Sequence, residues 1–191
     1  MKGTRIARIF AWLFVAGLSG CVTPPPGPRQ VLDAKTGATL MVVDEPLILA
    51  RERRDVAVQA RDYLTVVAAE INLSGRRRLF LAVHEWSTID SRATSPMIRG
   101  HPALLLVADG RDLRLETAVD QAATALMGSR DLLRPEDAIV TTTLYDVDAA
   151  TLDYLATSKT LAAAYPESFA LPYHIWRDGR PALTRLLTTI R

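Results

Sequence analysis

The side chains best suited to bind a ligand or a partner are concentrated around one predicted connection, residues 87–102. A connection of about sixteen residues is longer than most in compact domains, and such connections are often functional. It carries carboxylate, guanidinium and imidazole groups and directly follows an indole. The candidate binding residues are Trp86, Asp90, Arg92, Arg99 and His101. We therefore expect a ligand or partner surface at this connection.

The three histidines do not predict a metal centre. His84, His101 and His174 lie in distant segments and lack the close ligand spacing typical of zinc sites. His84 and Glu85 are neighbours on a predicted strand, so their side chains point to opposite faces and cannot share a metal ion. We expect no metal and no cofactor.

No motif predicts catalysis. The chain after residue 20 contains no GxSxG, GxGxxG, phosphate-binding loop or HExxH pattern. A serine triad or a carboxylate pair assembled from distant residues is an alternative that no spacing favours, so no catalytic residue is assigned. Trp86, Tyr173 and Trp176 either line a binding groove or belong to the core and its rim, and strand spacing favours the core.

Cys21 is the only cysteine of the chain, and its surroundings predict export. Lys2, Arg5 and Arg8 precede an apolar run, Ile9–Leu18, which is followed by two small residues and then by Cys21. This order is typical of a secretory signal peptide. The run is about half as long as the ~20 residues of a transmembrane helix. With no second cysteine, the domain has no disulfide.

The sequence Leu18-Ser19-Gly20-Cys21 resembles the lipobox of bacterial lipoproteins. In that family the cysteine thiol receives a diacylglycerol, the peptide is cut before the cysteine, and the new amine is acylated. The resemblance implies that residues 1–20 are removed and that Cys21 is lipidated. Val22, where lipoproteins of the inner membrane often carry Asp, implies the outer membrane. Two or more acyl chains would hold the protein stably on the membrane. The alternative is a chance cysteine after an ordinary signal peptide.

The rest of the chain is similar to small uncharacterised lipoproteins of Gram-negative bacteria. The similarity lies in residues 36–39, in residues 62–64 and 72–75, and in Trp86-Ser87-Thr88-Ile89-Asp90. Such lipoproteins bring no catalytic residues that could be transferred to this sequence.

Charge gives no argument for nucleic acid. The chain has 23 Lys and Arg against 21 Asp and Glu, and three of the cations lie in residues 1–20. The remaining chain is close to neutral, so a nucleic-acid partner is not expected.

After the signal segment we expect a lipidated Cys and proline-rich tether at 21–30, followed by one domain at 31–191. The patterns predict an α+β fold, an antiparallel sheet built from hairpins with two or three helices, mostly in the C-terminal half. The predicted hairpins span 31–43, 62–88 and 103–116; further strands are 46–50, 138–145 and 169–176; and helices follow Thr117, Asp148 and Pro181.

Three functions follow from these patterns. The leading one is a non-enzymatic accessory or interaction module, held in the outer membrane, facing the periplasm and binding an envelope protein. The alternative is a small-ligand-binding lipoprotein that uses a cleft between Trp86 and the 87–102 connection. The third is a metal-free hydrolase, which would need a histidine near both a serine and an acid.

Overall fold

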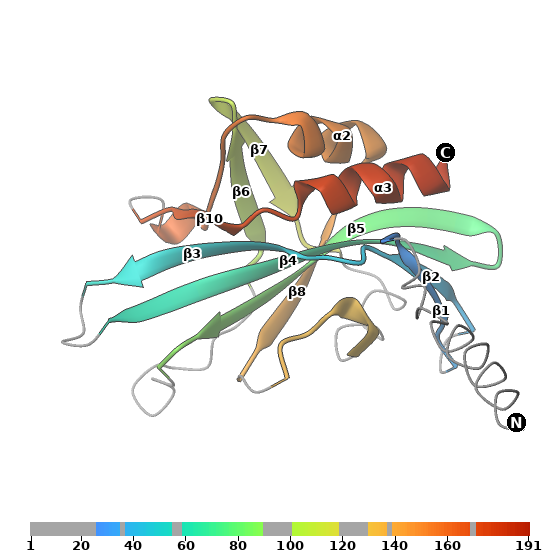
Figure 1. Cartoon of the computed structure of the whole chain (residues 1–191), viewed down its shortest axis with the longest axis horizontal. Coiled ribbons are helices and arrows are strands. Elements are labelled where there is room, and N and C mark those ends of the chain that lie inside the picture. Colours follow the sequence, from blue (N-terminus) through green and yellow to red (C-terminus); the bar gives the residue numbers. More distant parts are fainter. Residues whose placement is uncertain are drawn as a thin grey trace, which may run out of the picture.

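The structure is a computed structural model that describes residues 26–34, 37–54, 59–89, 101–118, 130–136, 139–168 and 171–191. It combines one large antiparallel sheet with two helices near the C-terminus (Figure 1). The predicted α+β class is therefore confirmed. Among the described residues, no helix has the length and apolar character needed to cross a membrane.

Ten strands and two α-helices make up the described elements. The strands are β1 Arg29–Leu32, β2 Thr39–Val42, β3 Leu47–Arg53, β4 Ala60–Leu73, β5 Arg76–Ser87, β6 Ala103–Ala108, β7 Arg111–Glu116, β8 Thr141–Asp146, β9 Leu161–Ala164 and β10 Tyr173–Arg177. The helices are α2 Ala149–Thr157 and α3 Arg180–Ile190, with short 3-10 turns η1 at Arg130–Leu132 and η2 at Pro166–Ser168.

The sheet curls until its two ends meet. From β4 the strand order runs through β3, β10, β9 and β6 to β7, and on the other side β4 pairs with β5 and β5 with β8. Thr117, just after β7, forms a bridge with Tyr145 of β8, and the Ala118 amide donates to the Leu144 carbonyl at 2.8 Å. Eight strands thus form a closed ring, while β1 and β2 extend β4 outside it.

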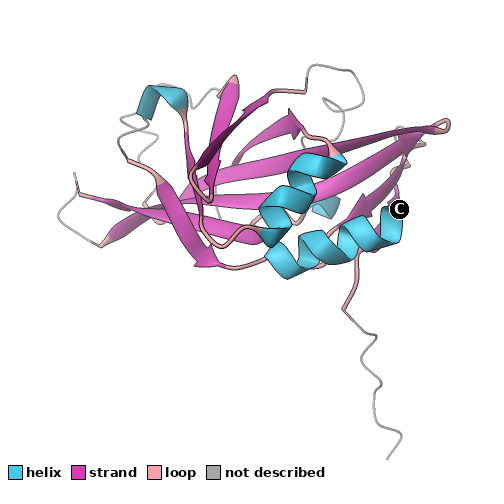
Figure 2. Cartoon of the chain, turned by 90° about the horizontal axis from the view of Figure 1, so that it is seen from above, coloured by secondary structure: helices cyan, strands magenta, loops and turns pink. Residues whose placement is uncertain are grey.

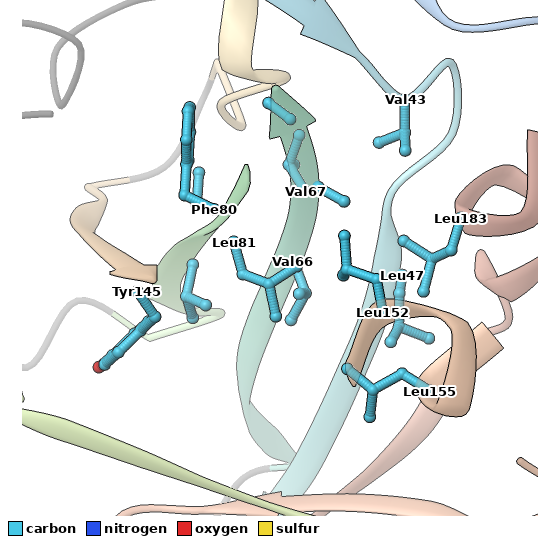
Figure 3. Packing of buried hydrophobic residues seen from close by; sticks show 14 of the residues in the cluster. Val43, Leu47, Val66, Val67, Phe80, Leu81, Tyr145, Leu152, Leu155 and Leu183 are labelled. Atoms are coloured by element: carbon cyan, nitrogen blue, oxygen red, sulfur yellow. The ribbon is translucent and has the colours of Figure 1, made fainter. Parts of the chain in front are cut away.

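Both faces of the central hairpin are buried. On the inner face, Val66 and Leu81 lie with Leu47 of β3 under Leu152 of α2 and Leu183 of α3 (Figure 3). On the outer face, side chains such as Val67, Ala69, Phe80 and Ala82 are also almost fully buried. β4 and β5 are therefore central strands that are covered on both sides.

The two helices cover the inner side of the sheet, the side on which β6 and β7 also lie (Figure 1), and they lie at an angle to each other when viewed from above (Figure 2). Asp148 is the N-cap of α2, as predicted, and its Oδ1 accepts from the Thr151 amide at 2.6 Å. An ion pair fixes α3 to the connection between β2 and β3. Arg185 of α3 donates to both carboxylate oxygens of Asp44 at 2.9 Å.

The predicted hairpins at 31–43, 62–88 and 103–116 are confirmed by strand pairing. The strand predicted at 46–50 corresponds to β3, and those at 138–145 and 169–176 are shorter, as β8 and β10. The helix predicted after Thr117 lies outside the described residues, and Thr117 itself takes part in the bridge to β8.

Strand β9 was not predicted. Its sequence, Leu161-Ala162-Ala163-Ala164, lacks the β-branched and aromatic residues that are enriched in strands. It forms because it lies between β10 and β6 and pairs with both. Here pairing with neighbours outweighs local preference.

Gly179 is needed where α3 approaches the start of β3. Its φ of −95° is ordinary for any residue, but a Cβ at this position would lie 2.5 Å from Leu47 N and from the Pro46 carbonyl. The obstacle is backbone, which cannot rotate away as a flexible side chain would. The close approach of these two segments therefore requires glycine.

We expect Gly179→Ala to lower the free energy of unfolding by about 2–3 kcal/mol, because the methyl group must displace backbone. Urea unfolding followed by circular dichroism measures the effect. Gly110→Ala is the matched control: its φ is +79° with open space around the new methyl, so only backbone strain of about 1–2 kcal/mol is expected. A loss at position 179 no larger than the control's would contradict the steric argument.

Candidate functional site

A partly buried carboxylate lies at the centre of a polar cluster inside the ring. Glu85 of β5 is opposite Leu64 of β4 and Thr141 of β8, and its side chain is 15% exposed. The hydroxyl of Tyr173 donates to Oε1 at 3.3 Å, and that of Tyr165 reaches Oε2 at 3.5 Å. Two hydroxyls from distant segments thus converge on one acid.

His101 joins this acid to a second one. Its Nε2 lies 3.6 Å from Glu85, and its Nδ1 lies 3.6 Å from Glu167 of η2. The imidazole stacks on the Tyr165 ring with centroids 3.5 Å apart, and the His101 carbonyl accepts from the Tyr145 hydroxyl at 2.9 Å. We call the set Glu85, His101, Tyr165, Glu167 and Tyr173 the Glu85 cluster.

Burial decides the electrostatics of the cluster. Loss of water raises the pKa of Glu85, and the neighbouring His101 and Arg51 oppose the rise only in part. Burial, followed by the charge of Glu85, also raises the pKa of Tyr165 and of Tyr173. The two phenols therefore keep their protons and act as donors to the carboxylate.

An ion pair lies beside the Glu85 cluster. Arg51 of β3 donates through Nε to Asp62 of β4 at 3.1 Å, and its guanidinium lies 4.4 Å from the centroid of the Tyr173 ring. The pair thus packs against the same tyrosine that donates to Glu85. It connects β3 and β4 to β10 at this end of the ring.

The geometry of the Glu85 cluster is better suited to holding distant segments of the chain together than to catalysis. In a hydrolytic triad, one ring nitrogen of the histidine is hydrogen-bonded to a carboxylate and the other is hydrogen-bonded to the nucleophile. In the described part of the chain, each nitrogen of His101 faces a carboxylate instead. That part also contains no group of three or more His, Cys, Asp or Glu side chains arranged to hold a metal ion.

His84 has a structural role on the opposite face of the same strand. Its Nδ1 lies 2.9 Å from the Thr142 hydroxyl and its Nε2 lies 2.7 Å from the Leu132 carbonyl. Burial lowers the pKa of this fully buried imidazole, so it is neutral and donates from Nε2. Both ring nitrogens are used to hold η1 and β8 against β5.

Aromatic side chains gather on the outer face of the sheet, near the same end of β5. Trp86 stacks on Tyr63 of β4 with centroids 4.2 Å apart, and Trp176 of β10 meets Tyr63 edge to face at 6.1 Å. The Arg61 guanidinium lies 4.7 Å from the centroid of the Trp176 ring. Trp176 is 56% exposed. We call Arg61, Tyr63, Trp86, His174 and Trp176 the aromatic face.

Strand pairing explains why these residues share one face. Trp86 is directly opposite Tyr63, Tyr63 opposite Ala50, and Ala50 opposite His174, so the row crosses four strands. Side chains at paired positions point to the same side of a sheet. Ala50 contributes only a methyl group between Tyr63 and the exposed His174.

The predicted ligand residues do not converge. His101 contacts Glu85, whereas Trp86, the next residue on β5, points to the outer face, so His101 and Trp86 lie on opposite sides of the sheet. Asp90, Arg92, Arg99 and the predicted lipidation site Cys21 lie outside the described residues.

The sequence patterns did not predict the central residue of each group. Glu85 is the one acid on a strand face otherwise formed by Leu79, Leu81 and Val83, and this isolated charge was a usable signal. Tyr63 carries no comparable signal, because only its partners across the sheet give it a role.

A shallow groove lies at the other end of β4 and β5. It encloses about 460 Å³ between the hairpin tip, β8 and the end of α3. Its charged residues are paired: Arg77 binds Glu70 at 2.7 Å and Arg78 binds Asp146 at 2.5 Å. Two of the three arginines at 76–78 therefore serve ion pairs within the domain.

Comparison of the chain with models of known protein families, with curated proteins and with solved structures finds no match.

We expect Glu85→Gln to reduce the pH dependence of stability. A carboxyl whose pKa is raised in the folded state stabilises the protein below its ordinary value of 4.5, and this contribution is lost as pH rises through the raised value. Gln keeps an oxygen for the tyrosine hydroxyls and carries no charge. The variant should gain stability relative to the natural protein as pH increases from 4.5 to 8.

Urea unfolding of both proteins at several pH values measures this difference. His84 titrates in both proteins, so its contribution to the pH dependence of stability cancels in the comparison. A difference between the two proteins that stays constant with pH would contradict the account of Glu85.

Proposed function

We propose that this chain is a lipid-anchored protein of the outer membrane whose domain faces the periplasm and acts as a non-enzymatic interaction module of the cell envelope. The lipid on Cys21 would anchor it, and the residues from Cys21 to the start of β1 at Arg29 would serve as the tether. The domain would bind another envelope component through the aromatic face.

The exposed aromatic face is the observation that carries this proposal. Trp176 is 56% exposed although it contacts Tyr63 and Arg61, so a large ring is held in place yet open to a partner. Rigid aromatic side chains are common at binding surfaces because they offer contact area at little entropic cost. The ionisable groups of the Glu85 cluster, in contrast, are directed at one another.

The position of the aromatic face also supports a tethered module. β2, which follows the first strand after the tether, pairs with residues 69–72 of β4, while Tyr63 lies six residues away along the same strand. This separates the attachment side from the aromatic face by about 20 Å. A proline-rich tether of about eight residues would add roughly 20–25 Å between the domain and the lipid surface.

Confinement to the membrane would let a weak contact suffice. A domain held near its partner by an anchor binds at a high effective concentration, so a small surface such as the aromatic face can give useful occupancy. Loss of the anchor would then weaken binding even though the domain is unchanged.

We expect Cys21→Ser, made with an ordinary cleavable signal peptide in place of residues 1–20, to move the protein from the membrane fraction to the soluble fraction, because the thiol that would carry the lipid is missing. Fractionation of cells followed by immunoblotting measures the distribution, with washing at high salt to remove proteins held by charge alone. Asp112→Ala, an exposed change on β7, is the control and should stay in the membrane fraction. Retention of Cys21→Ser in the membrane would overturn the anchor.

A photo-crosslinking residue at His174 should capture one envelope component in living cells, because this exposed position belongs to the aromatic face. The same residue at Asp112 is the matched control and should capture nothing specific. Mass spectrometry identifies the adduct, and combining the label with Cys21→Ser should reduce its yield. Equal patterns from the two positions would refute a role for the aromatic face.

A further inference from the structure

Resting on the proposed function, we propose that the aromatic face binds a glycan, a chain of pyranose rings, with Trp176 as the stacking residue. The proposal names the chemical class of the bound component. It follows from the ring geometry, from the size of the exposed patch and from the polar groups at its edge.

The rings offer both a fixed and an exposed surface. Tyr63 is only 8% exposed because Trp86 stacks on it at an interplanar angle of 11°, whereas Trp176 lies at 82° to Tyr63. Trp176 is thus held by its neighbours while more than half of it faces solvent. The C–H groups on one face of a pyranose ring pack well against the electron-rich face of an indole.

The apolar part of the exposed patch is a single ring. At 56% exposure, Trp176 offers roughly 140 Å² of surface, given the size of a tryptophan side chain. A specific protein complex buries about 800 Å² on each partner. One exposed ring with polar neighbours matches the footprint of one or two sugar rings better.

Charge at the patch is mixed. Arg61 forms an ion pair with Glu52 at 3.6 Å, and the exposed Arg177 follows Trp176. A strongly anionic partner such as a phosphate-rich surface would be opposed by the Glu52 carboxylate, which is 70% exposed. The mixed charge therefore favours a ligand whose recognition does not depend on its net charge.

Hydroxyl groups would find partners of both kinds at the edge of the patch. The Glu52 carboxylate accepts hydrogen bonds, the Arg61 and Arg177 guanidinium groups donate them, and the exposed His174 imidazole can do either. Donors and acceptors placed around an apolar ring are the combination that orients a polyhydroxylated ligand.

Titration of the purified full chain with two neutral probes tests the proposal: the hexamer of N-acetylglucosamine and cellohexaose. Isothermal titration calorimetry measures the affinity of every variant, including those that lack the Trp176 indole, and a change in the tryptophan fluorescence of the natural chain supports contact at the aromatic face. We expect saturable binding of at least one probe, with little dependence on salt. Trp176→Ala should weaken it at least about tenfold, Trp176→Tyr should restore most of the affinity, and Leu171→Ala should have no effect. Leu171 is the control because it is 57% exposed.

The outcomes separate this proposal from the broader one. If neither probe binds, or if Trp176→Ala binds as well as the natural chain, the glycan is ruled out. If His174 then still captures an envelope protein in cells, the interaction module stands with a protein partner. If neither probe binds and His174 captures nothing specific, both proposals fail. Circular dichroism of each variant confirms that the fold is kept.

Discussion

Twelve consecutive residue pairs join β4 to β5, and this hairpin positions the rest of the domain. β2 and β3 pair with successive parts of β4, and β8 pairs with β5. Because the hairpin is buried on both faces, it must be covered by helices and strands on the inner side and by η1 near His84 on the outer side. The domain has no disulfide, so the cohesion of this hairpin and its coverings stabilises the fold.

The alternation of side chains along β5 separates two kinds of chemistry by a single residue. Glu85 points inward to two tyrosines and His101, and Trp86 points outward to Tyr63. The inner cluster therefore does not share a pocket with the outer rings. It supports them instead, because Tyr173, which donates to Glu85, belongs to the same short strand as Trp176. A partly buried, hydrogen-bonded acid thus helps hold an exposed ring in place.

The proposed binding module takes its support from where the ionisable and aromatic groups lie. Burial raises the pKa of Glu85, a property that active sites also show. Here the acid is surrounded by donors from the protein itself, and His101 lies between two carboxylates. The side chains open to a partner are the indole of Trp176 and its polar neighbours, which are equipped for contact and hydrogen bonding. The lipid anchor at Cys21 stays a prediction from the sequence.

Local patterns in the sequence determined the hairpins at 31–43, 62–88 and 103–116, the Asp148 cap and the last helix, because turn residues and side-chain periodicity act between near neighbours. They did not determine β9, the bridge from Thr117 to Tyr145, the approach of His101 to Glu85 or the contact of Trp176 with Tyr63. Each of these joins segments far apart in the chain. Such contacts depend on how the sheet curls and packs, which only the tertiary structure decides.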